Sequence, residues 1–379
     1  MRLRALSPRH CRVHRTHWLV RSVGLVTVGV LAVGPSAVAA ISYRADSNMS
    51  RHNTNRLLPA PPPVDPAAGK SLNILLIGSD DRSGENEIIG GAAEGVRSDT
   101  TIIMHISSDR RRIEMVSIPR DSLVTIPACT TTRGTTKPAR NAMFNNAFAV
   151  GWDVGGDMAS AVACTINTVQ TNTGLRIDHS IVVDFAGFQQ MVDAVGGVNL
   201  CLDRPMKDAH YTGLDLDAGP QRLNGVQALQ FARARHIVGT DGSDTSRIDR
   251  QQQLLAGLAH EVLSKNVFTS TRELLRFVQA VTKSLSMDTA LSWDTIVGLA
   301  YSLRHVDTSK IVFTTIPFDP VGNRVRWSAQ ADAVWAAMAT DRSVADVLNP
   351  PAGKDTPGPQ PAQLTSVEDV EAARQVCAA

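Results

Sequence analysis

The chain has 379 residues, which is enough for one large domain or two small ones. It is 43% hydrophobic and 20% charged, so we expect most of it to fold around a substantial core rather than remain disordered. The formal net charge of +2 gives no overall signal for nucleic-acid binding, and we expect no nucleic-acid partner.

The N-terminal region carries its charge on one side of an apolar run. Residues 1–22 hold six arginines and no acidic residue, and the apolar run follows at residues 23–41. A helix of that length spans roughly 30 Å, the hydrocarbon thickness of a bilayer. The arginines place the N-terminus in the cytoplasm and the rest of the chain outside the plasma membrane. A cleaved signal peptide is the alternative, because residues 37–40 resemble a cleavage site, but the run is long for a signal core.

Composition divides the remainder into three parts. Residues 42–70 are rich in proline and predict an extended linker that lifts the domain off the membrane. Residues 71–348 predict a compact domain, and residues 349–379 predict a flexible tail that contains Cys377. Within this tail, residues 366–376 predict a short helix that places Cys377.

Four cysteines follow the apolar run, namely Cys129, Cys164, Cys201 and Cys377. An even number outside the membrane favours two disulfides, for which the sequence allows three pairings. We favour Cys129 with Cys164, which leaves Cys201 with Cys377. No CxxC pair is present, which argues against metal binding by these cysteines.

Strand and helix patterns alternate along the domain. Apolar runs predict strands at residues 72–77, 100–107, 112–118, 181–183, 198–202 and 311–317. Helical periodicity predicts helices at residues 158–173, 185–195, 248–263, 269–286, 292–303 and 329–340. This alternation predicts an α/β fold, with helices on both faces of a sheet.

Acidic residues stand beside the first two predicted strands. Asp80 and Arg82 follow the first strand, and Arg97 and Asp99 precede the second. Strand ends are where ligand sites form in such folds, and two carboxylates suit a hard cation such as Mg²⁺. The structural alternative is a polar loop and a strand-entry cap.

Arginines also occur at the ends of predicted elements further along the chain. Arg120 follows Pro119 at the end of the third strand. Arg233 and Arg235 point to the same face if their segment is extended, where their guanidinium groups suit a pyrophosphate. The alternatives are a plain strand terminator and a solvated basic face.

A second arginine patch begins the helix at residues 248–263. Arg247, Arg250 and Gln251 lie within one turn of each other. Arginine at a helix N-terminus opposes the macrodipole, which favours an anion-binding role over a structural one.

Together these segments resemble the LytR-CpsA-Psr family over about residues 72–263. The resemblance runs through Gly78–Arg82, Arg97–Thr100, Ser117–Asp121, Ile177–His179, Val183–Phe185, Asp193–Val198, Leu223–Arg235 and Arg247–Gln251. The chain departs from the family at Met143, Trp152 and Phe231, where the family carries lysine, glycine and tyrosine.

The resemblance implies an α/β/α sandwich around a central mixed sheet, with an N-terminal transmembrane helix. It implies transfer of a glycopolymer from an undecaprenyl- or decaprenyl-pyrophosphate carrier to the 6-hydroxyl of peptidoglycan N-acetylmuramic acid. Asp80 and Asp99 resemble ligands for Mg²⁺, or for Mn²⁺ in its place. The catalytic candidates are Arg97, Arg120, Arg233 and Arg235, and the substrate-binding candidates are Arg82, Arg247, Arg250 and Gln251.

Two other functions use the same residues. A pyrophosphatase acting on polyprenyl or nucleotide diphosphates would use water as the nucleophile, and a non-catalytic envelope protein would bind the lipid or the wall polymer. The alanine- and arginine-rich composition suggests a high-GC actinobacterium, in which arabinogalactan and teichoic-type polymers are the candidate glycans.

Overall fold

The computed structural model describes residues 50–52, 69–81, 85–90, 95–237, 244–264, 285–291, 306–349 and 364–378, with a few helical positions between 295 and 303. All of these belong to one compact unit, Asn48–Ala379. The predicted membrane segment at residues 23–41, most of the linker, and Arg82 lie outside the described residues. Among the helices that the structure describes, none combines the length and apolar character that crossing a bilayer requires.

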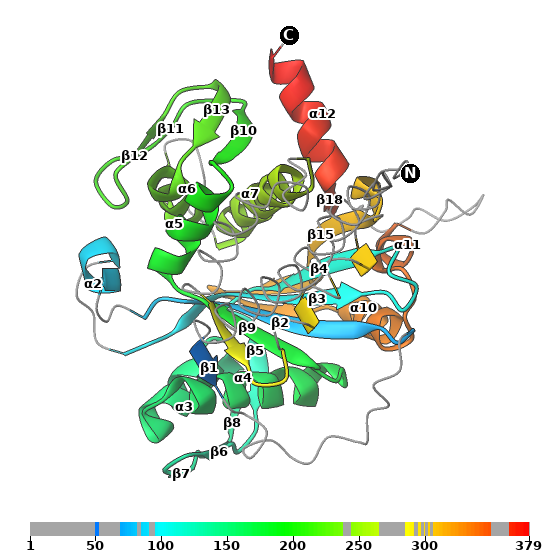
Figure 1. The fold of residues 1–379 in the computed structure, drawn as a ribbon. Coiled ribbons are helices and arrows are strands. Elements are labelled where there is room, and N and C mark those ends of the chain that lie inside the picture. The colour runs from blue at the N-terminus through cyan, green and yellow to red at the C-terminus, as the bar shows by residue number, and fades with distance from the viewer. Residues whose placement is uncertain are drawn as a thin grey trace, which may run out of the picture. The chain divides into compact units, whose positions relative to one another are not determined.

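A mixed sheet forms the centre of the domain. Within the described residues it has eight strands in the order β1-β14-β9-β2-β3-β4-β15-β18 (Figure 1). Their bounds are β1 Ser50–His52, β14 Leu285–Asp288, β9 His179–Val183, β2 Leu72–Ser79, β3 Ser98–Ile106, β4 Ile113–Ile118, β15 Ile311–Thr315 and β18 Leu364–Ser366. Strands β2, β9, β4 and β15 run in one direction, and β3 lies antiparallel between β2 and β4.

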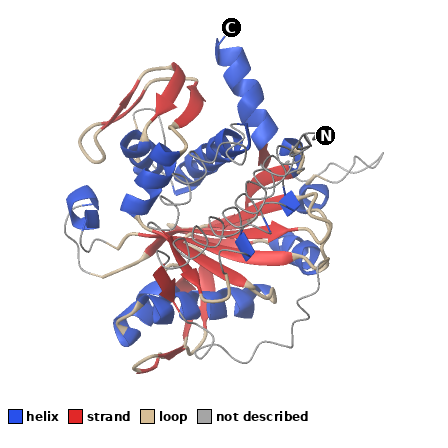
Figure 2. Cartoon of the chain, in the orientation of Figure 1, coloured by secondary structure: helices blue, strands red, loops and turns tan. Residues whose placement is uncertain are grey.

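Helices cover both faces of this sheet (Figure 2). One face carries α3 (Asn146–Gly155), α4 (Met158–Thr173), α10 (Ala329–Ala339) and α11 (Val344–Leu348). Their apolar side chains form one core with those of the sheet, including Ile77, Ile103, Val162 and Trp335. The other face carries α7 (Asp244–Ser264) and α12 (Val367–Ala378), which pack on Phe313 of β15. The α/β/α arrangement predicted from the sequence is therefore confirmed.

A smaller layer lies beyond α7. It contains α5 (Phe185–Ala194), α6 (Gly225–Arg233), and the strand pairs β10 (Val198–Leu202) with β13 (Gly219–Leu223) and β11 (Met206–Asp208) with β12 (Leu214–Leu216). These elements share a second apolar cluster with α7. The remaining short elements are α2 Glu85–Gly90, β5 Leu123–Ile126, β6 Thr130–Thr131, β7 Gly134–Thr135, β8 Ala139–Met143, the 3-10 helix η1 Thr308–Lys310, β16 Phe318–Val321 and β17 Arg324–Trp327.

Some predicted segments differ from the structure. Residues 285–286, predicted as the end of a helix, begin strand β14 because their backbone pairs with β9. Residues 269–284 of that predicted helix lie outside the described residues. Ser50–His52, predicted as linker, form β1 through parallel pairing with β14. The tail is not loose throughout, since β18 and α12 pack against the domain.

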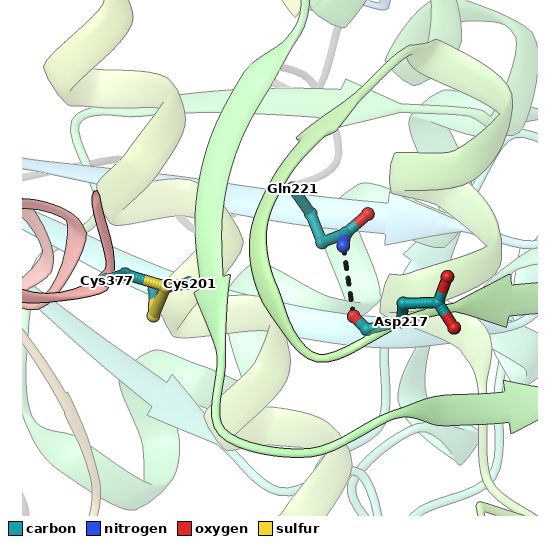
Figure 3. The surroundings of a disulfide bond; sticks show 4 residues. All are labelled: Cys201, Asp217, Gln221 and Cys377. Atoms are coloured by element: carbon teal, nitrogen blue, oxygen red, sulfur yellow. Dashed lines mark hydrogen bonds between the residues drawn. A yellow bond between two sulfur atoms is a disulfide. The ribbon is translucent and has the colours of Figure 1, made fainter. Parts of the chain in front are cut away.

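The C-terminal helix is attached by a disulfide. The predicted Cys201–Cys377 bond is present and joins β10 to α12 across 176 residues of sequence (Figure 3). Beside it, Gln221 of β13 donates a hydrogen bond to the Asp217 carbonyl at 3.0 Å. The helix predicted near Cys377 is confirmed, because α12 spans Val367–Ala378.

The predicted Cys129–Cys164 disulfide is absent from the structure. Both residues are free, buried thiols. The Cys129 backbone N–H donates to the Thr136 hydroxyl at 2.9 Å, and the Cys129 thiol donates to the Pro127 carbonyl at 3.4 Å. The predicted bond was therefore wrong, because both residues remain thiols in this structure.

Candidate functional site

The predicted site residues that the structure describes lie around one edge of the sheet. Strands β2, β9, β4 and β15 all end there, and the antiparallel β3 begins there. Gly78 of β2 pairs with Val183 of β9, and Ser79 pairs with Ser98 of β3. The carboxyl ends of parallel strands are where ligands bind in open α/β sheets. The topology therefore explains why motifs far apart in sequence meet.

Asp80 holds the start of β3. Its backbone N–H donates to the Arg97 carbonyl at 3.0 Å, and its carboxylate accepts the Arg97 N–H at 2.7 Å. The Arg97 side chain is exposed at this edge. Gly78 packs closely beside this junction, because a Cβ there would lie 3.1 Å from Thr100 Cβ. The two acidic motifs are thus joined through their backbones.

Two arginines contact Asp99, and the charge of a third acts on its carboxylate. Arg120, after β4, donates to Asp99 Oδ1 at 2.9 Å. Arg247, on α7, is buried, and its Nη1 lies 3.9 Å from the same oxygen while Nη2 donates to the Asp99 carbonyl at 3.1 Å. Burial alone would raise the pKa of Asp99. The charges of Arg247, Arg120 and Arg235, with the Arg120 hydrogen bond, outweigh burial and hold that pKa below its usual value.

Helix α7 supports the segment that carries Arg233 and Arg235. Buried Arg250 donates through Nη2 to the Ala234 carbonyl, and Gln251 donates to the Ala232 carbonyl at 3.3 Å. Gln251 also accepts the Thr100 hydroxyl at 3.1 Å. Gln251 therefore connects β3 to α6, and Arg250 holds the residue that follows α6. Direct contact with a substrate stays a prediction for both.

Arg233 is positioned by an aromatic ring. Its guanidinium carbon lies 4.4 Å from the centroid of the Phe185 ring at the start of α5. Such a cation–π contact is worth about 0.5–2 kcal/mol. The prediction that Arg233 lies in an extended segment was wrong, because Asn224 and Gln227 form a capping box that begins α6, and Arg233 is its last residue. Arg235 follows in a non-helical segment.

Sequence reasoning missed two supporting groups. Gln252, buried on α7, donates to the hydroxyls of Ser117 and Thr315 at 3.2 and 3.0 Å. It thereby bonds α7 to the ends of β4 and β15. Arg324 of β17 lies 3.4 Å from Asp121, the neighbour of Arg120. The alternating basic residues of β17, Arg324 and Arg326, were the available signal for this hairpin.

The donor set fits a hard divalent cation that shares its shell with phosphate. Among the residues described, no three or more His, Cys, Asp or Glu side chains come together as a metal site. Mg²⁺ commonly takes only one or two protein carboxylates, with water and phosphate oxygens as its other ligands. Asp99 is held ionised and is about one-third exposed, and Asp80 lies at the adjoining strand junction. Binding of an ion by these two carboxylates stays a prediction.

The chain is similar to known proteins over most of its length. The LytR_cpsA_psr family model matches residues 36–347. The chain is 32% identical over 268 residues to the cell wall biosynthesis protein LcpA of Corynebacterium glutamicum, covering 66% of this chain and 51% of LcpA. It is 34% identical over 221 residues to the polyisoprenyl-teichoic acid–peptidoglycan teichoic acid transferase TagU of Oceanobacillus iheyensis, covering 58% of this chain and 60% of TagU. The chain thus spans between half and three-fifths of these two relatives.

A solved structure shares the fold. The LytR-Csp2A-Psr enzyme from Actinomyces oris superposes with a TM-score of 0.54 at 21% identity, covering 78% of this chain and 97% of that one. At this identity the likeness establishes the central mixed sheet with its covering helices.

Proposed function

The chain belongs to the LytR-CpsA-Psr family, and from this premise we propose that it is a phosphotransferase that moves a wall glycopolymer from a polyprenyl-pyrophosphate carrier to peptidoglycan. The contacts of Arg120 and Arg247 with Asp99 are the observation that carries the proposal, and the charge of Arg235 also acts on this carboxylate. The similarity to TagU, a teichoic acid–peptidoglycan transferase, supports the reaction class.

The arginines supply the main chemical contribution. Guanidinium groups bind phosphate through planar, charge-assisted hydrogen bonds, each worth about 1.5–3 kcal/mol. Arg120 contacts Asp99 from the segment after β4 and Arg247 contacts it from α7, so a diphosphate beside Asp99 would meet donors on two sides. Fixed donors of this kind stabilise the charge that develops on the phosphate oxygens during transfer.

The proposed step exchanges one phosphorus–oxygen bond for another. The 6-hydroxyl oxygen of N-acetylmuramic acid bonds to the phosphorus attached to the glycan, and the bond from that phosphorus to the bridging oxygen breaks. The lipid phosphate leaves with the bridging oxygen, and the hydroxyl proton is released. Mg²⁺, or Mn²⁺ in its place, when held by Asp80 and Asp99, would neutralise charge on the phosphate oxygens.

We place the reaction outside the plasma membrane, with residues 23–41 as a single membrane helix and the N-terminus in the cytoplasm. The Cys201–Cys377 disulfide supports this location, because structural disulfides persist in oxidising compartments. The arginines before residue 23 support the orientation.

A transfer assay tests the proposal. The full-length protein in detergent is incubated with Mg²⁺, a radiolabelled polyprenyl-pyrophosphate glycopolymer and purified peptidoglycan. We expect label in the insoluble peptidoglycan fraction, joined by a phosphodiester that phosphodiesterase releases. Omitting peptidoglycan separates the alternatives, since a pyrophosphatase would still release lipid phosphate at the same rate.

The Arg235→Ala variant provides the internal comparison. We expect it to lose both lipid-linked substrate binding and transfer. Binding of the lipid-linked glycan by the unmodified protein with no turnover under any acceptor or metal condition would instead indicate a non-catalytic envelope protein.

A further inference from the structure

An exposed aromatic side chain stands beside the arginine segment. Tyr211 is 65% exposed, and it is the sole aromatic among the exposed large hydrophobic side chains in the described part of the chain. Its ring stacks on His236 at 3.9 Å between centroids and 25° between planes. His210 packs edge-on at 5.1 Å. We call these three residues the Tyr211 platform.

The backbone fixes this platform in place. Tyr211 lies in the turn between β11 and β12, which closes when the N–H groups of Thr212 and Gly213 donate to the Asp208 carbonyl at 3.0 and 3.1 Å. Gly213 adopts a φ of +77°, a conformation that favours glycine. The ring is therefore presented on a closed turn, and β12 packs against α6.

One carboxylate connects the platform to the candidate site. Asp208 Oδ2 accepts the backbone N–H of Arg235 at 3.0 Å and that of His236 at 3.4 Å. After Arg247 and Arg120, Arg235 is the third arginine whose charge lowers the pKa of Asp99. The platform thus begins one residue beyond a proposed diphosphate ligand, and the buried Asp208 holds both segments in register.

The chemistry of the platform fits a sugar ring. A rigid tyrosine supplies a large amphipathic contact surface at low conformational entropy cost. Its surroundings are polar: the flanking hairpin carries the exposed Lys207–Asp215 ion pair, and two imidazoles adjoin the ring. A pyranose offers an apolar C–H face to stack on the ring and hydroxyls for these polar neighbours, whereas a polyprenyl chain would offer them no hydrogen-bonding group.

We propose that the Tyr211 platform binds a sugar ring of the glycan adjoining the reacting diphosphate, an inference that rests on the proposed function. That ring belongs either to the lipid-linked donor or to the peptidoglycan acceptor. In this proposal Tyr211 recognises the glycan, whereas the arginines bind phosphate.

Two lipid probes isolate the sugar contribution. Full-length protein in detergent is titrated with undecaprenyl pyrophosphate and with undecaprenyl-pyrophosphate N-acetylglucosamine. We expect Tyr211→Ala to weaken binding of the sugar-bearing lipid roughly 3–10-fold, the scale of one aromatic stacking contact, and to leave the sugar-free lipid within about twofold. Tyr211→Trp should retain the preference for the sugar-bearing lipid.

A third titration, with soluble peptidoglycan fragments, identifies the source of the ring. Weakened binding of the fragments alone would assign the platform to the acceptor. The matched control is Val154→Ala, which truncates another exposed side chain on α3. Thermal unfolding of each variant verifies that it is folded.

Two results would overturn the inference. Either Tyr211→Ala leaves all three affinities unchanged, or it weakens the sugar-free lipid as much as the sugar-bearing one, which would mean that it only displaces Arg235. Because these are binding measurements, they distinguish failure of the platform from failure of the transfer reaction.

Discussion

Replacing Asp99 with asparagine removes the charge on which three arginines act while keeping the shape of the side chain. The Arg120–Asp99 bond is 2.9 Å long, and its two side chains are 22% and 34% exposed. A charge-assisted hydrogen bond is worth about 1.5–3 kcal/mol, and this exposure reduces it to about 1–2 kcal/mol. If arginine placement is the whole role of Asp99, kcat/KM should fall roughly 5–30-fold.

A metal titration distinguishes the positioning of the arginines by Asp99 from direct binding of the metal ion by Asp99. Transfer is measured in the wild type and in Asp99→Asn over a range of Mg²⁺ concentrations. If Asp99 also holds the ion, the half-maximal Mg²⁺ concentration should rise by about tenfold or more. The pKa of Asp99 is held below the usual 3.8, so the carboxylate stays ionised above pH 4. The activity ratio of variant to wild type should therefore be the same at pH 6 and pH 8.

Asp109→Asn is the matched control. Asp109 lies in the turn at the far end of β3, where it accepts hydrogen bonds from Ser107 and from the Arg111 backbone. We expect unchanged transfer in this variant. Wild-type kcat/KM and wild-type Mg²⁺ dependence in Asp99→Asn would refute the reasoning about the site.

Three further predictions concern stability. Cys201→Ser with Cys377→Ser should lower the free energy of unfolding by about 2–5 kcal/mol, and treating the wild type with reductant should give the same thermal midpoint as the variant. Gly225→Ala should destabilise by about 1–3 kcal/mol in urea unfolding, because its Cβ would lie 2.3 Å from the Gln189 carbonyl oxygen, whereas Gly134→Ala, with open space around it, should change little. Burial tends to raise the pKa of Asp288, but hydrogen bonds from His179 and the Ser180 backbone hold it below 3.8. The stability lost in Asp288→Asn should therefore be constant above about pH 5 and shrink as the pH falls below 4 in acid unfolding curves.

Local sequence signals predicted the bounds of an element well where capping residues marked both of its ends. The helix at residues 158–173 has its predicted bounds because Asp157 caps its N-terminus and Gly174 its C-terminus. The same kind of signal, Asn224 with Gln227, was present before α6, but the paired arginines were interpreted as a strand. The short pairs β5 with β8 and β6 with β7 had no clear periodicity, because strands of two to five residues carry too few side chains to establish one.

The types of residue at the site could be predicted from the sequence, but their arrangement in space could be predicted only in part. The motif arginines suggested phosphate binding, and Arg120 and Arg247 do contact Asp99. The sequence could not indicate which groups support the site from behind. Gln252, on the apolar face of its predicted helix, has hydroxyl partners from strands separated by almost two hundred residues. Such contacts depend on strand order, which local patterns do not specify.

The pairing of Cys201 with Cys377 has a consequence for biogenesis. If the part of the chain that follows residue 41 is exported in sequence order, Cys129, Cys164 and Cys201 reach the oxidising side well before Cys377. A further 176 residues must then be exported before Cys201 can meet its native partner, whereas Cys164 is already available. Burial of Cys164 within the α4 layer protects against that mispairing, so early folding of this layer should determine how much protein matures with the correct bridge.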